Sequence, residues 1–140
     1  MNEVLLYIPD EKKRTAVLQY VKAQRLTAGV IGPKDIDRVI GELVFSPGPF
    51  DLQAYLKASG LKEKPYVKAP VLFQMPELMI LCNMPEQKTD AFLSGYRAAG
   101  LQPIALKAML TKHNILWTPY TLALHLKEED ARVRAFEKTE

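Results

Sequence analysis

Short apolar runs alternate with amphipathic segments along the chain. Residues 4–8 form an apolar run that Pro9 ends, a pattern typical of a buried strand. The following segment begins with acidic residues and then places apolar side chains at helical spacing. A second short run at 29–32 predicts another strand, and Pro33 is placed to open another helix. The N-terminal part of the chain therefore predicts the order strand, helix, strand, helix.

The same order is predicted again toward the C-terminus. An apolar run at 78–82 predicts a strand, and the segment after Pro85 predicts a helix that Gly100 ends. Residues 103–106 are expected to be extended, and Thr118 is placed as the N-cap of the last helix. Two separate parts of the chain thus follow one pattern.

An offset of 75 positions aligns these two parts without a gap. The identical pairs are Leu6 with Leu81, Glu11 with Glu86, Lys13 with Lys88, Ala16 with Ala91, Leu18 with Leu93, Ala23 with Ala98 and Leu26 with Leu101. We interpret this similarity as a diverged duplication. The alternative is that the two parts are unrelated β-α units of similar length. Such units resemble each other because a buried strand followed by an amphipathic helix requires the same pattern of apolar positions.

Strands that alternate with helices predict an α/β fold. We expect two diverged βαβα repeats, at 1–45 and 75–140, that share one largely parallel sheet with helices packed on it. Residues 46–74 are expected to be a linker with a short helix at 50–60, and residues 71–73 are expected either to add an edge strand or to dock on the second repeat. The alternative architecture is two compact subdomains joined at 46–70.

Composition and charge narrow the function classes. The net charge of +3 is too small to indicate a nucleic-acid-binding protein. The single cysteine, Cys82, excludes an internal disulfide, and with only two histidines a Cys/His zinc site is not expected. Neither a phosphate-binding loop nor a dinucleotide-binding motif occurs, so we expect no cofactor. No apolar run is long enough to span a membrane, and we expect a cytoplasmic protein.

The segment from about residue 75 to 129 resembles a known family. Its most specific part runs Leu-Lys-Ala-Met-Leu-Thr over 106–111, continues with Asn114 and Trp117, and precedes a leucine-rich helix. In this pattern it is similar to DUF3783, a family of uncharacterised bacterial proteins found chiefly in Firmicutes. Pro119 departs from the family pattern. The family has no established activity, so the resemblance implies where a site lies but not its chemistry.

Polar side chains gather between the last predicted strand and the last predicted helix. The candidate ligand-binding residues are Lys107, Thr111, His113, Asn114 and Trp117. In open parallel sheets such a loop lies at the edge where ligands bind. We expect a small anion or carboxylate held by Lys107 or the neighbouring Lys112, oriented by the hydroxyl and amide groups, with the indole as a wall.

A structural interpretation of the same residues stays open. Thr111 and Asn114 can satisfy backbone groups of the loop, Trp117 can anchor the core, and both lysines can be solvated. His113 lacks a partner that the sequence identifies as activating it. Cys82 lies at the end of an apolar strand and is expected to be buried and inert, although a nucleophile at this β-to-α junction stays open.

These observations favour a small non-enzymatic module that binds a small anionic ligand or a protein partner. No pair of titratable groups is spaced so that one could activate the other. A groove between the two repeats is a natural place for a ligand, a peptide or a second subunit, so a homodimer is an open alternative. The alternative function is a small enzyme acting on a carboxylate or phosphorylated metabolite at loop 107–117.

Overall fold

The computed structural model describes residues 1–61 and 63–139, with the side chains of the last helix described up to residue 131. Four strands form one sheet in the order β2-β1-β3-β4. Their bounds are Val4–Tyr7 for β1, Ala28–Val30 for β2, Leu78–Leu81 for β3 and Leu106–Met109 for β4. β1 pairs with β2 and β3 pairs with β4 in parallel, whereas the central β1–β3 pair is antiparallel. The prediction of one shared, largely parallel sheet is confirmed, and the alternative of separate subdomains is wrong.

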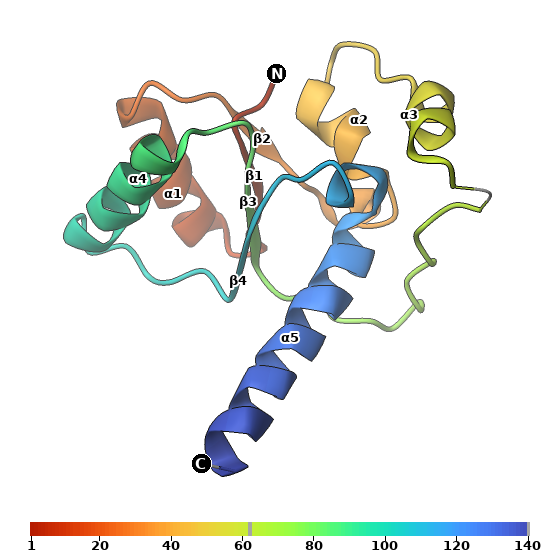
Figure 1. Cartoon of the computed structure of the whole chain (residues 1–140). Helices are drawn as coiled ribbons and strands as arrows, with labels where there is room; N and C mark the ends of the chain where they lie inside the picture. Colours follow the sequence, from red (N-terminus) through yellow and green to blue (C-terminus); the bar gives the residue numbers. More distant parts are fainter. Residues whose placement is uncertain (62, 140) are drawn as a thin grey trace.

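Helices cover both faces of this sheet, which gives the three layers seen in Figure 1. One face carries α1 (Glu11–Ala23) and α4 (Glu86–Ala98), and the other carries α2 (Ile40–Phe45) and α5 (Pro119–Thr139). The short α3 (Leu52–Ser59) lies outside α2 on the second side. Within the part of the chain that the structure describes, none of the helices has the length and apolar character needed to cross a membrane.

The alternation of side chains along the central strands creates two cores. Val4 and Leu6 of β1 point toward α1 and α4, while Leu5 points toward α2 and α5. In β3, Met79 contributes to the first core and Ile80 to the second. Both faces of the central strands are therefore buried, which explains why these segments are apolar at every position rather than at alternate ones.

The two halves share their order of elements. β1, α1, β2, a 3₁₀ helix η1 (Pro33–Asp35) and α2 are followed, after α3, by β3, α4, β4, a 3₁₀ helix η2 (Asn114–Leu116) and α5. The bounds of α1 and α4 differ by the same 75 positions that align the sequences. This shared order is compatible with a duplication, and the common origin of the halves itself stays a prediction.

Ion pairs cross between the halves in a reciprocal way. Lys13 of α1 pairs with Glu77, just before β3, at 2.7 Å. Its counterpart Lys88 of α4 pairs with Glu3, just before β1, at 3.6 Å. The central antiparallel pairing places the start of each of these strands beside the end of the other, where the neighbouring helix begins. In both pairs a lysine of the helix in one half thus contacts a glutamate just before the first strand of the other half.

The predicted helix that begins at Pro33 is broken in the structure. After η1 the chain is extended at Val39, and α2 begins only at Ile40. The Ile36 carbonyl accepts a hydrogen bond from the Tyr120 N–H at 3.0 Å, and the Ile40 N–H donates to the Trp117 carbonyl at 2.7 Å. These bonds to the second half replace the helical bonds that a continuous helix would form.

Two predicted strands also differ from the structure. Residues 103–105 are not part of a strand, and β4 begins at Leu106, because Pro103 has no N–H to donate to a ladder. The edge strand predicted at 71–73 is wrong, since these residues form a turn in which Val71 is 99% exposed. The alternative expected for this segment is found instead, because Phe73 docks on the second half, edge-on to Tyr120 at 4.6 Å between ring centroids. The short helix predicted within 50–60 is confirmed as α3.

Candidate functional site

The turn after β4 is held by an asparagine and a threonine. The buried Asn114 side chain accepts a hydrogen bond from the Thr111 N–H at 2.8 Å and donates one to the Met109 carbonyl at 2.9 Å. The Asn114 N–H donates to Thr111 Oγ1 at 3.0 Å. Both side chains thus satisfy polar groups of their own turn, which is the structural interpretation of these two candidate residues.

Trp117 is fixed in place on the far side of this turn. Its backbone N–H donates to the Asn114 carbonyl at 3.0 Å, and its backbone carbonyl accepts from the Ile40 N–H. The half-buried indole stacks on the His125 ring of α5, with centroids 4.2 Å apart and planes inclined by 18°. The indole is therefore a rigid wall supported from one side by an imidazole.

A cavity of about 600 Å³ lies between α3 and η2 and includes this indole in its wall. Its lining residues are Tyr55, Ala58, Ser59, Leu61, Pro65, Lys112, His113, Leu116 and Trp117. Two of the five candidate residues, His113 and Trp117, thus line this cavity. Lys112, the alternative cation, lines it as well.

Local signals explain how α3 comes to form the second wall. Asp51 caps its N-terminus by accepting from the Ala54 N–H at 3.1 Å, and Gly60 ends it with a φ of 72°. The Phe50 ring packs against Tyr55 with centroids 4.7 Å apart, and it also covers the Cα of Gly41 in α2. This aromatic contact joins α3 to the body of the protein.

Lys107 is not part of the cavity. The sequence places it in a loop from 107 to 117, but the structure places it in the edge strand β4, opposite Met79. Its side chain is exposed and does not line the cavity. The cavity is therefore formed by the later part of the predicted loop and by α3.

The lining of the cavity combines apolar walls with positive charge. The Lys112 and His113 side chains are exposed and lie at one side, on the turn before η2. Among the residues that the structure describes, those that line the cavity include no Asp or Glu. The Ser59 hydroxyl donates to the Leu56 carbonyl of its own helix at 2.8 Å. The arrangement suits a ligand with an apolar body and an acidic group.

Sequence reasoning missed the α3 wall of this cavity. Tyr55, Ala58, Leu61 and Pro65 lie in the segment interpreted as a linker, about fifty residues before the candidate loop. The one available signal was Tyr55 on the apolar face of the predicted short helix. That face indicates packing, but not which part of the chain it packs against.

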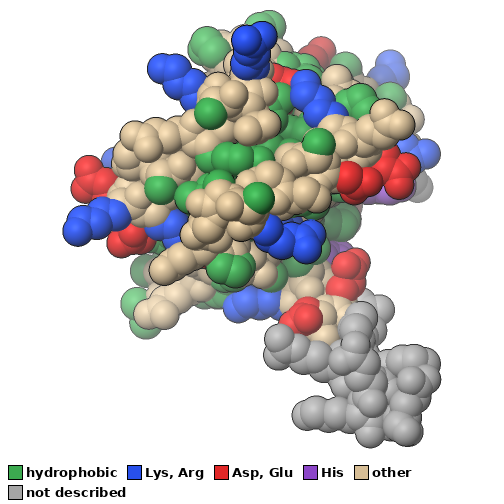
Figure 2. All heavy atoms as spheres, turned by 90° about the vertical axis from the view of Figure 1, so that its left-hand side faces the viewer, with side chains coloured by type: hydrophobic (Ala, Val, Ile, Leu, Met, Phe, Trp, Pro, Cys, Tyr) green, Lys and Arg blue, Asp and Glu red, His purple; other side chains and the backbone are tan. Residues whose placement is uncertain are grey.

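The face of the molecule formed by α1 and α4 offers a smaller hollow. Figure 2 shows hydrophobic side chains in the seam between the two helices and charged side chains around it. A hollow of about 320 Å³ lies between α1 and the loop after α4, where the sequence suggests a groove between the repeats. Its lining residues are Asp10, Lys12, Lys13, Ala16, Val17, Gly100, Leu101 and Gln102.

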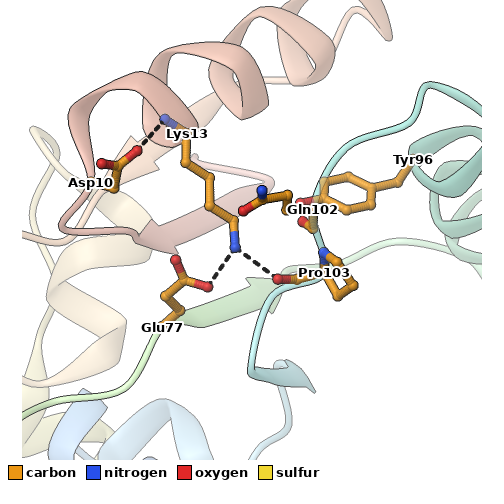
Figure 3. Close-up of polar contacts among 6 residues, drawn as sticks. All are labelled: Asp10, Lys13, Glu77, Tyr96, Gln102 and Pro103. Atoms are coloured by element: carbon orange, nitrogen blue, oxygen red, sulfur yellow. Dashed lines mark hydrogen bonds and ion pairs between the residues drawn. The ribbon is translucent and has the colours of Figure 1, made fainter.

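The polar groups beside this hollow form hydrogen bonds with one another (Figure 3). The Lys13 ammonium donates to Glu77 at 2.7 Å and to the Pro103 carbonyl at 2.8 Å. The Tyr96 hydroxyl donates to the Gln102 carbonyl, and burial, followed by the charge of Glu77, raises the pKa of this phenol. These groups join α1, β3 and the loop after α4, so we assign them a structural role.

Cys82 is buried at the end of β3, as expected from the sequence. Burial raises the pKa of its thiol to about 12, so the group is a neutral thiol at neutral pH. Reactive cysteines need accessible, electropositive surroundings that stabilise the thiolate. Among the described residues, His, Cys, Asp and Glu side chains form no group of three that could hold a metal ion.

The fold and cavity define a small three-layered α/β protein with a ligand-sized cavity on one side of its sheet. Its C-terminal half, residues 77–133, matches the family model of a domain of unknown function, DUF3783, which confirms the resemblance predicted from the sequence. No curated protein and no solved structure matches the chain. The matched segment contains the η2 wall of the cavity, whereas α3 lies outside it.

Proposed function

We propose that this protein is a small-molecule-binding module whose site is the cavity between α3 and η2. The observation that carries this proposal is the cavity itself. Its volume of about 600 Å³ lies within the range of about 300–1,000 Å³ typical of ligand sites. Apolar and aromatic side chains dominate the walls and only a few polar groups line them, which is the usual composition of such sites.

The arrangement supports binding better than catalysis. The described residues give the His113 ring no hydrogen-bonded carboxylate that would orient it as a general base. The nearby hydroxyl of Ser59 donates to a backbone carbonyl instead of to an imidazole. Cys82 belongs to the core beneath α2 and α5 and does not line the cavity. We extend the proposal to a cytoplasmic, non-enzymatic protein that binds a small ligand.

A variant that fills the cavity tests this function. Ala58→Phe places a ring inside the cavity, whereas Gln53→Phe places the same ring on an exposed position of α3 that does not line it. We expect a thermal-shift screen of metabolites to find compounds that raise the melting temperature of the wild type and of Gln53→Phe. A ligand at about a hundred times its Kd stabilises a protein by about 2.7 kcal/mol, enough to shift the melting temperature by several degrees.

The same compounds should leave the melting temperature of Ala58→Phe unchanged. A library without any stabilising compound would contradict the proposal. Compounds that stabilise Ala58→Phe as much as Gln53→Phe would bind elsewhere, and this outcome would also reject the cavity as the site.

A further inference from the structure

We infer that the cavity between α3 and η2 selects a flat, apolar ligand that carries a single carboxylate, such as an arylalkyl carboxylic acid. This inference rests on the proposed function and specifies the ligand class for the same site. It follows from three features of the lining: the sign of its charge, the number of its donors and the shape of its walls.

The charge of the lining sets the sign of the ligand. Lys112 contributes an ammonium group and His113 a second nitrogen donor, and both lie on the turn that leads into η2. Since none of the described residues that line the cavity is acidic, no carboxylate among them repels an anion or neutralises Lys112. No ion pair with Lys112 occurs among the described residues, so its charge is available to a ligand.

The number of donors favours a carboxylate over a phosphate. Phosphate sites commonly use several backbone N–H groups at a helix N-terminus. The helix starts beside the cavity are already bonded within the chain, because Thr111 accepts from the first N–H groups of η2 and Thr118 accepts from the Thr121 N–H in α5. One ammonium and one imidazole suit a group with a single negative charge.

The walls favour a planar, apolar body. The Trp117 ring is supported by His125 on one side and lines the cavity, and the Tyr55 ring lines it from α3. Leu61 and Leu116 add aliphatic surface. Aromatic ligands stack favourably on such rings, and the pre-positioned indole reduces the entropy lost on binding.

The single tryptophan provides a direct readout of the cavity. Trp117 is the only tryptophan in the sequence, so a change in tryptophan fluorescence reports binding beside it. We choose 3-phenylpropionate and its neutral amide as probes because they have the same shape and differ in charge. The titrations use the whole chain, with excitation at the red edge of the tryptophan absorption, where a phenyl group does not absorb.

We expect the acid to bind at least about tenfold more tightly than the amide, a difference of about 1.4 kcal/mol. Lys112→Met should remove most of this preference and leave the affinity for the amide unchanged. Lys107→Met is the matched control, since it deletes an exposed lysine outside the cavity, and it should keep the preference.

The outcomes separate this inference from the proposed function. Equal affinities for acid and amide would overturn the ligand class while leaving the cavity as a binding site. An acid preference that survives in Lys112→Met, or is lost equally in Lys107→Met, would also overturn it. If neither probe changes the fluorescence but the metabolite screen finds cavity ligands, the class is wrong and the function stands. If the screen is silent too, both fail.

Discussion

Single residues show where equivalent positions of the two halves have diverged. Arg25 and Gly100 both follow a helix by two residues, and both have positive φ, of 61° and 74°. Each N–H donates to the carbonyl three residues before it, at 2.9 Å from Arg25 and 3.0 Å from Gly100. Glycine adopts this left-handed conformation without the steric cost that a side chain adds.

Because glycine occupies position 100 in this conformation, we expect glycine to be favourable at position 25 as well. Arg25→Gly should raise the free energy of unfolding by about 0.5–1 kcal/mol, because the relief of backbone strain exceeds the entropy cost of a more flexible unfolded chain. Urea denaturation measures this difference. Gly100→Ala is the reciprocal change and should lower the stability by about 1 kcal/mol. A loss of stability in Arg25→Gly would contradict this interpretation of the helix end.

At the scale of elements, the ion pairs that link the halves differ in environment. Lys13 and Glu77 have only 15% and 24% of their side chains exposed, whereas Lys88 is 50% exposed. The Lys13 ammonium also donates to the Pro103 carbonyl. The first pair is therefore partly removed from water, and the second is a surface pair screened by solvent.

This difference predicts unequal costs for equivalent substitutions. Lys13→Met should lower the free energy of unfolding by about 1–3 kcal/mol, because it leaves the Glu77 carboxylate and the Pro103 carbonyl without their donor. Lys88→Met should cost less than about 0.5 kcal/mol. Chemical denaturation of both variants compares them, and equal costs would show that the burial of the first pair has no energetic consequence.

Elements with a strong local pattern were predictable from the sequence. The buried strands β1 and β3, the amphipathic α1 and α4, and the start of α5 after Thr118 depend on apolar periodicity and on caps. The break before α2 was not predictable, because the groups that replace its helical hydrogen bonds belong to Trp117 and Tyr120. Such bonds join residues about eighty positions apart, and no local pattern records them.

At the scale of the whole molecule, the candidate site likewise combines features that a local pattern predicts with features that depend on contacts between distant residues. The turn from Thr111 to Trp117 was predictable, because its polar residues lie together in sequence between a strand and a helix. The sequence left open whether Thr111 and Asn114 bind a ligand or their own turn, and it did not show that Lys107 lies in β4. The opposite wall comes from α3, which reaches the turn only in the folded chain.

The architecture separates a central, symmetric body from a peripheral cavity. The strands with α1 and α4 form a body in which the two halves contact each other through reciprocal lysine–glutamate pairs. The cavity instead lies on the other side of the sheet, between the turn after β4 and the helix that joins the halves (Figure 1). We therefore assign stability to the symmetric body and binding to the cavity between α3 and η2.

Chemical-shift mapping of the whole chain by NMR tests this assignment most directly. On titration with 3-phenylpropionate, the account predicts that the largest amide shifts fall in α3 and in residues 112–117, and that the Trp117 indole N–H shifts with them. Resonances of α1 and α4 should remain nearly unchanged. Shifts confined to the α1–α4 face, or no shifts at a concentration that saturates the fluorescence signal, would contradict it.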